Sequence, residues 1–160
     1  MLYVALKFLH VLGACVLLGT GAGIAFFMLL AHRSNDVGVI AGVTRIVVTA
    51  DFLFTATAVV AQPVTGIALA SVSGYKIGEG WIVLSILLYL LTGAFWLPVV
   101  WMQLRMRTLA ATALRAGEPL PPVYHRLFRT WFAFGFPAFG AVLGIFWLMI
   151  ARPEIPLLTF

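Results

Sequence analysis

Four long apolar runs, separated by short polar segments, dominate the pattern of this chain. They predict helices at about residues 2–31, 42–73, 81–115 and 122–151. A helix that crosses a bilayer needs about 20 predominantly apolar residues, and each run supplies them. Hydrocarbon offers no partners to an unpaired backbone amide, so such runs must be helical. The pattern therefore predicts an all-α bundle of four transmembrane helices, forming a single domain over residues 1–160.

The connection between the third and fourth runs is the longest. Arg105–Ala116 has a helix-forming composition and should extend the third helix into water. Gly117 suits a helix C-terminus, because glycine tolerates the left-handed conformation found there. Pro122 suits the first turn of the fourth helix, where a missing N–H costs nothing.

Composition agrees with a membrane location. The sequence is 63% hydrophobic and only 9% charged, against about 25% in a soluble domain. The net charge of +5 does not indicate nucleic-acid binding, because the cations flank apolar runs. Seven arginines cluster on the side that holds the first and third connections: Arg33, Arg45, Arg105, Arg107, Arg115, Arg126 and Arg129. This bias predicts a bacterial inner-membrane protein with both termini on the non-cytoplasmic side.

Two pairs of glycines recur at a spacing of four residues. Gly19 and Gly23 form one pair, and Gly140 and Gly144 form the other. Small residues at this spacing let helix backbones approach closely. The pairs indicate either packing within the bundle or a homodimer.

Ionisable groups within hydrocarbon are costly and are functional-site hypotheses by default. Lys7 and His10 are three residues apart, so they share a helix face. Antiparallel helices should bring four further polar residues to a similar depth: Gln62, Thr65, Ser85 and Tyr89. This predicts a polar pocket in the outer half of the membrane. His10 could ligate haem or transfer protons there. Alternatively, it is a neutral structural histidine bonded to Gln62, Tyr89 or a helix carbonyl.

Asp51 should lie about two turns inside the cytoplasmic end of the second helix. Arg45 precedes it by six residues and falls on a different helix face, so Arg129 or Arg105 is the better expected partner. Asp51 is either a paired or protonated structural carboxylate, or a proton or substrate site. Because it lies in the opposite half from His10, the two should not act directly on one small substrate.

The sequence gives little indication of a metal site or of a known catalytic motif. His32, Asp36 and His125 could meet at the cytoplasmic surface, but their spacing is not that of a metal site, and none is predicted. The sequence contains no catalytic serine motif or phosphate-binding loop. The single cysteine, Cys15, excludes an intrachain disulfide.

Nearly the whole chain resembles a bacterial family of four-helix integral membrane proteins of unknown function. Four segments carry the resemblance: Leu6–Gly13, Gln62–Gly66, Trp96–Val100 and Arg129–Trp131. The resemblance implies the architecture but no activity.

The opening of the first helix also resembles two better-understood groups: haem-b-dependent membrane protoporphyrinogen oxidases and copper-resistance D membrane proteins. Lys7, His10 and Gly13 carry this similarity. The oxidase resemblance implies that His10 ligates haem. The sequence departs from the oxidases after Trp81, where the lysine of that group is absent. One chain also has a single membrane-embedded histidine, so a second axial ligand would have to be another residue type or come from another subunit.

These observations favour a membrane protein that binds haem b or serves a redox role through His10. The first alternative is a non-enzymatic membrane anchor or interaction subunit. The second is a small proton or solute transporter that uses Asp51 and His10. The sequence does not decide whether the protein is an enzyme.

Overall fold

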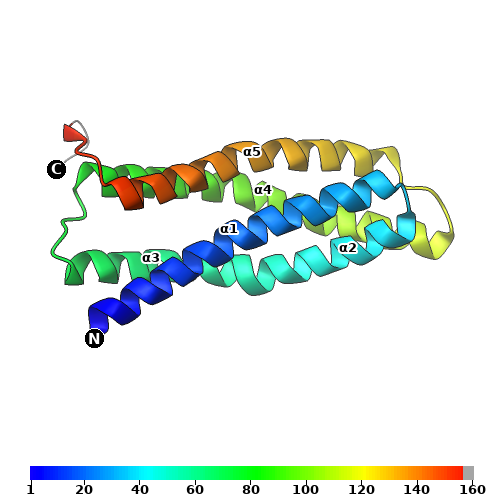
Figure 1. Ribbon diagram of the computed structural model, residues 1–160. Coiled ribbons are helices and arrows are strands. Elements are labelled where there is room, and N and C mark those ends of the chain that lie inside the picture. The colour runs from blue at the N-terminus through cyan, green and yellow to red at the C-terminus, as the bar shows by residue number, and fades with distance from the viewer. Residues whose placement is uncertain (157–160) are drawn as a thin grey trace.

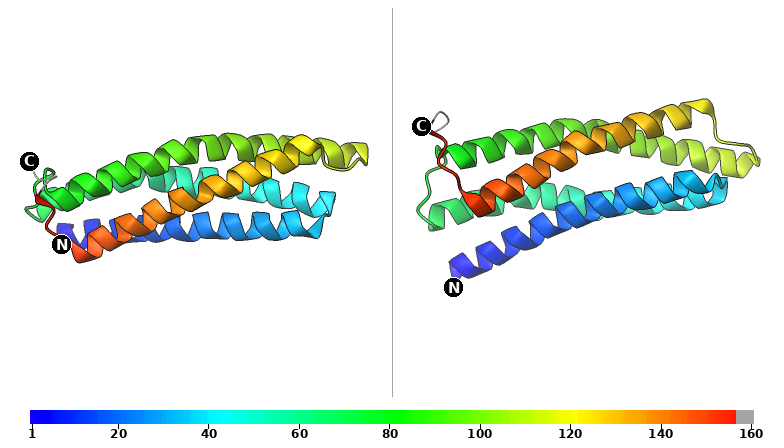
Figure 2. Two further views of the ribbon diagram at one scale, coloured as in Figure 1. Left: turned by 90° about the horizontal axis from the view of Figure 1, so that it is seen from above. Right: turned by 45° about the horizontal axis from the view of Figure 1, so that its top comes forward.

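The computed structural model describes residues 1–156 and is an all-α bundle of four long antiparallel spans, as predicted (Figure 1). The spans are α1 (Leu2–Ser34); a continuous second helix made of α2 (Val37–Ala50), η1 (Asp51–Thr55) and α3 (Ala56–Val72); α4 (Gly80–Ala116); and α5 (Pro122–Ala151). Residues 157–160, which belong to the predicted single domain, lie outside the described part. Both ends of the described chain lie at one end of the bundle (Figures 1 and 2).

The surface of the bundle is suited to lipid. All four spans are long and apolar enough to cross a membrane. Large apolar side chains cover the outside, such as Leu90, Phe136 and Ile150, with 61%, 66% and 81% of their surfaces exposed. A soluble monomer rarely exposes so continuous an apolar surface. Fatty-acyl chains therefore act as the solvent of these helices.

Helix ends follow local capping chemistry. Gly117 ends α4 in the left-handed conformation, with φ 66°, and Pro122 begins α5, both as predicted. The second helix begins at Val37 rather than near residue 42, because the Asp36 carboxylate accepts a hydrogen bond from the Val39 amide at 2.9 Å. An aspartate at this position satisfies an otherwise unpaired amide, so the helix starts directly after the turn.

The second span contains one turn of π-helix that the sequence pattern did not predict. At η1 the amide of Ala56 donates to the carbonyl of Asp51, five residues back, instead of four. Asp51 and Thr55 are buried, whereas Phe52, Leu53 and Phe54 point outward and are about half-exposed. Such turns are rare, and they occur frequently at functional sites.

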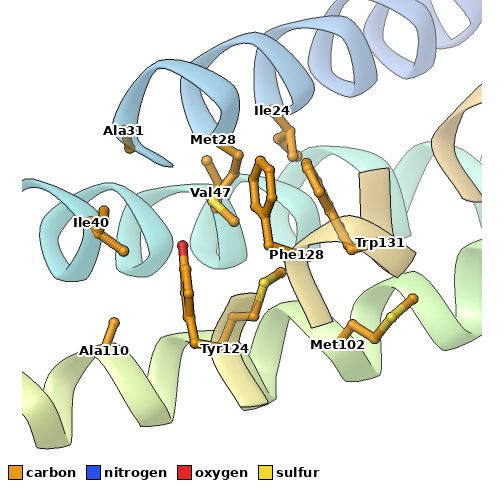
Figure 3. Close-up of a cluster of buried hydrophobic side chains, with 11 residues drawn as sticks. Ile24, Met28, Ala31, Ile40, Val47, Met102, Ala110, Tyr124, Phe128 and Trp131 are labelled. Carbon is orange, nitrogen blue, oxygen red and sulfur yellow. The ribbon is translucent and has the colours of Figure 1, made fainter. Parts of the chain in front are cut away.

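The apolar core lies in the half of the bundle that contains the α1–α2 and α4–α5 connections. It consists of Ile24, Met28, Ala31, Ile40, Val47, Met102, Met106, Ala110, Tyr124, Phe128 and Trp131. In Figure 3 the aromatic side chains of α5 project between α4 and the pair formed by α1 and α2. Among the described residues of α1, none before Ile24 is buried. In the opposite half, α1 is therefore held to the other helices differently.

The two glycine pairs differ in the contacts that they make within the bundle. A Cβ atom added at Gly19 or Gly140 would meet no atom within 4 Å, and at Gly23 it would meet only the Phe27 ring of the same helix. Gly144, in contrast, packs against Leu88, whose Cδ1 would lie 3.2 Å from such a Cβ. Packing within the bundle thus accounts for Gly144 but leaves the Gly19–Gly23 face of α1 open.

The arginine bias predicts which end faces the cytoplasm. In a Cys15→Ser background, a cysteine at position 76 should react with a membrane-impermeant maleimide in intact cells. A cysteine at position 115 should react only after permeabilisation, because the positive-inside bias places it in the cytoplasm. Labelling of both positions from the same side would contradict the four-span arrangement.

Candidate functional site

His10 joins α1 to α3 through two hydrogen bonds. Its Nδ1 lies 3.0 Å from Thr65 Oγ1, and its backbone carbonyl accepts a hydrogen bond of 2.9 Å from Gln62 Nε2. Gln62 and Thr65 are three residues apart on α3, so they present adjacent groups on one helix face. The structure thus brings together three of the polar residues expected in the outer-half pocket.

Two glycines make this contact possible. A Cβ at Gly66 would lie 3.1 Å from Cε1 of His10, and a Cβ at Gly13 would overlap the Gln62 amide nitrogen. Each polar side chain therefore lies over a glycine of the opposite helix. Close approach of this kind gives transmembrane helices van der Waals contact as well as a hydrogen bond.

The hydroxyl of Thr65 links the tautomer of His10 to hydrogen bonding within α3. Thr65 Oγ1 donates its single hydrogen to a carbonyl of its own helix, Ala61 O at 2.8 Å or Gln62 O at 3.2 Å. The tautomer compatible with those bonds has Nδ1 of the neutral imidazole as the donor to Thr65 Oγ1. Nε2 consequently keeps its lone pair, which is the form of histidine that binds metals.

The other residues expected in the pocket have different roles. Lys7 is exposed, and its Nζ lies 5.7 Å from the centroid of the Tyr3 ring. Ser85 is buried and donates to the Trp81 carbonyl of its own helix at 2.7 Å. No hydrogen bond among the described residues links Lys7, Ser85 or Tyr89 to His10.

Tyr89 supplies a hydrogen-bond donor that α3 lacks. Pro63 has no N–H, so the carbonyl of Val59, four residues earlier, loses its helical donor. The hydroxyl of Tyr89 donates to that carbonyl at 2.5 Å. In hydrocarbon a bare carbonyl is costly, and this bond links α4 to α3. The Tyr89 hydroxyl therefore bonds to the α3 backbone and is not free to bind a ligand at His10.

A second polar cluster surrounds Asp51, which is only 4% exposed. Trp96 Nε1 donates to its Oδ1 at 3.4 Å, and the Gln103 amide donates to Oδ2 at 3.2 Å in the orientation that satisfies both of its neighbours. The Gln103 oxygen then accepts from Trp131 Nε1 at 3.2 Å. The Thr55 hydroxyl faces the same carboxylate but lies outside hydrogen-bond geometry. The cluster joins η1, α4 and α5.

The partners of Asp51 are therefore neutral donors and not the expected arginines. Arg45, Arg105 and Arg129 are all exposed. Long guanidinium side chains reach water more cheaply than they enter the bundle interior. Sequence reasoning missed Gln103, although its spacing of seven residues from Trp96 places both on one face of α4. Asp51 and His10 belong to separate hydrogen-bond networks among residues 1–156.

The three polar residues expected at the cytoplasmic surface do not form a common site. The His32 ring stacks on Phe128, with centroids 3.7 Å apart, and its centroid lies 5.5 Å from that of His125. The Asp36 side chain caps α2 instead. Within residues 1–156, no three histidine, cysteine or acidic side chains are grouped so that they could hold a metal ion.

Comparison with known families gives one match. The model of the family described as predicted integral membrane protein (DUF2269) matches residues 4–153, which is nearly the whole chain. The chain belongs to the DUF2269 family. Membership agrees with the four apolar spans and establishes an integral membrane protein, while the family description names no activity. Searches of curated proteins and of solved structures found no match for this DUF2269 protein.

The role of Tyr89 can be tested by a double-mutant cycle. Tyr89→Phe should lower the free energy of unfolding by about 1 kcal/mol, because the Val59 carbonyl loses its donor. In a Pro63→Ala background the cost should nearly vanish, since the substituted residue supplies the missing backbone N–H. Unfolding by SDS in detergent micelles measures both costs. An equal cost in the two backgrounds would refute this role of Tyr89.

The Asp51 cluster predicts a graded response. Asp51→Asn keeps one acceptor for two donors, whereas Asp51→Leu keeps none and leaves two buried donors unpaired. We expect Asp51→Leu to destabilise by about 1–3 kcal/mol for each unpaired donor, and Asp51→Asn to destabilise less. The same SDS titration applies, with the exposed Asp36→Asn cap variant as the charge-loss control. Indistinguishable Asn and Leu variants would contradict the assigned hydrogen bonds.

Proposed function

We propose that this DUF2269 protein binds haem b in the bacterial inner membrane, with Nε2 of His10 as an axial ligand and a redox role. The supporting observation is the hydrogen bond between Nδ1 of His10 and Thr65 Oγ1. This contact orients the ring and is compatible with the tautomer whose Nε2 lone pair is free, as for partners of metal-bound histidines generally. The helix-one resemblance carried by Lys7, His10 and Gly13 points to the same ligand.

A nearby cation and an exposed helix surface support this proposal. Lys7 is exposed on the same face of α1 and could neutralise a propionate. The outer half of α1 has no buried residue before Ile24 among those described, so its surface is available to a cofactor or a second subunit. When bound, haem b supplies one-electron chemistry.

A second copy of the chain is one source of the second axial ligand. One chain offers a single histidine at this depth, so a second copy could supply the other axial ligand. The Gly19–Gly23 face of α1 is open in the bundle and suits close helix–helix contact. It lies about 180° around α1 from His10, so a homodimer through this face would be separate from the haem site. The arginine bias would direct His10 and both termini toward the non-cytoplasmic side.

An absorption spectrum tests the proposal. Protein purified in detergent after expression with ample haem should show a Soret band. The band should disappear in His10→Ala, because the ligand is lost, and remain in His32→Ala, a histidine in the core half of α1. Thr65→Val should shift or weaken the band without abolishing it, since it removes only the partner of Nδ1. No Soret band in the wild-type protein would sink the haem proposal.

A second candidate function is that of a non-enzymatic membrane anchor or interaction subunit. The uncovered outer half of α1 also supports this reading, because an interface needs an apolar surface without partners inside the bundle. Co-purification of a stoichiometric partner that is lost on Gly19→Leu, but kept on the matched lipid-facing variant Val60→Leu, would favour it.

A further inference from the structure

A basic groove runs between α2 and α4 in the half of the bundle that contains the core. Its volume is about 340 Å³, and it is lined by Ala41, Arg45, Arg107, Thr108, Ala111 and Arg115. Half of these residues are arginines, and no carboxylate lies among them. Positions 41 and 45 on α2, and 107, 111 and 115 on α4, each follow a helical spacing of four residues. Two facing helix stripes therefore concentrate positive charge along one groove.

The alanines explain why the groove is open. Ala41 and Ala111 fill little space between the two helices, so the arginine side chains form its walls. The described acidic groups nearby are engaged elsewhere or lie beyond the helix end: Asp36 caps α2, and Glu118 follows α4. Arg115 Nη2 has one weak contact, to Thr112 Oγ1 at 3.4 Å. The groove thus favours an anion, and a phosphate matches the fork of a guanidinium.

A shallow apolar groove on the surface of α2 and η1 adjoins the basic one. It has a similar volume, about 340 Å³, and is lined by Arg45, Ile46, Thr49, Ala50, Leu53 and Phe54. Arg45 is common to both grooves. The floor at Ala50 is small, while Ile46, Leu53 and Phe54 are about half-exposed apolar walls. Leu53 and Phe54 belong to the π-helical turn η1.

The combination identifies the ligand class. A soluble phosphate compound would use the basic groove but would have no need of an apolar extension toward the membrane interior. An anionic glycerophospholipid has both parts: a phosphate at headgroup depth and an acyl chain directed inward. Basic pockets between transmembrane helices at the cytoplasmic side suit such headgroups.

We infer that the paired grooves form a binding site for an anionic phospholipid. The phosphate is held by Arg45, Arg107 and Arg115, and one acyl chain lies over Ala50 between Ile46 and Phe54. Arg45 marks the boundary between headgroup and chain. The site is independent of His10 and of the haem proposal, because it lies on other helices and in the other half of the bundle.

Native mass spectrometry of the purified protein tests the inference. Wild-type protein should retain phosphatidylglycerol in preference to phosphatidylcholine. Each arginine near an anionic headgroup corresponds to about a fivefold preference, so the triple variant Arg45→Gln, Arg107→Gln, Arg115→Gln should lose most of it. The matched control, Arg33→Gln, Arg126→Gln, Arg129→Gln, removes the same charge at the same membrane face outside the grooves and should retain the preference. Equal losses in the two triple variants would overturn the site.

Two further experiments distinguish a lipid phosphate from a soluble phosphate and test the placement of the acyl chain. Inorganic phosphate and glycerol 3-phosphate should not displace phosphatidylglycerol at millimolar concentration; displacement would indicate a soluble ligand and overturn the lipid assignment. Thr49→Trp should fill the apolar groove and reduce retention severalfold, whereas Val60→Trp, at a lipid-facing position elsewhere, should not. Equal retention in both tryptophan variants would contradict the acyl-chain placement.

Discussion

Hydrocarbon cannot hydrogen-bond, so a polar group inside this bundle is costly unless another part of the protein pairs with it. That constraint explains contacts that otherwise look unrelated. The Val59 carbonyl, deprived of its donor by Pro63, takes the hydroxyl of Tyr89. The Asp51 carboxylate takes donors from Trp96 and from the Gln103 amide. Each of these bonds joins separate helices, so satisfying the polar groups also holds the spans together.

The two halves of the bundle are stabilised by different means. Interlocked apolar side chains, with Tyr124 and Phe128 at the centre, fill the half that carries the arginines. In the other half, α1 relies on hydrogen bonds and glycine contacts with α3. The proposed haem site and the uncovered α1 surface lie in this second half. A surface that is not committed to the core remains available for a ligand or for a partner.

Sequence periodicity and length were sufficient to predict the four spans, because the bilayer dictates both. Local chemistry placed Gly117 and Pro122 correctly at helix ends. The encounter of His10 with Gln62 and Thr65 followed from comparing depths on antiparallel helices. Rotation about each helix axis was not available from depth alone. For that reason depth alone predicts Tyr89 in the pocket of His10 rather than bonded to the α3 backbone, and arginines rather than Gln103 beside Asp51.

The π-helical turn at Asp51–Thr55 sets the angular phase between the two halves of the second span. Each residue of an ordinary helix advances about 100°, so one residue accommodated in a wider turn shifts everything beyond it by about that angle. Val47 faces the core before the turn, and Gln62 faces α1 after it. A regular α-helix of the same sequence would swing Gln62 away from its partner, whereas deletion of one residue within the turn would restore a regular helix and keep Gln62 facing α1. The π-helical turn therefore sets the angle between the face of α2 that packs in the core and the face of α3 that packs on α1.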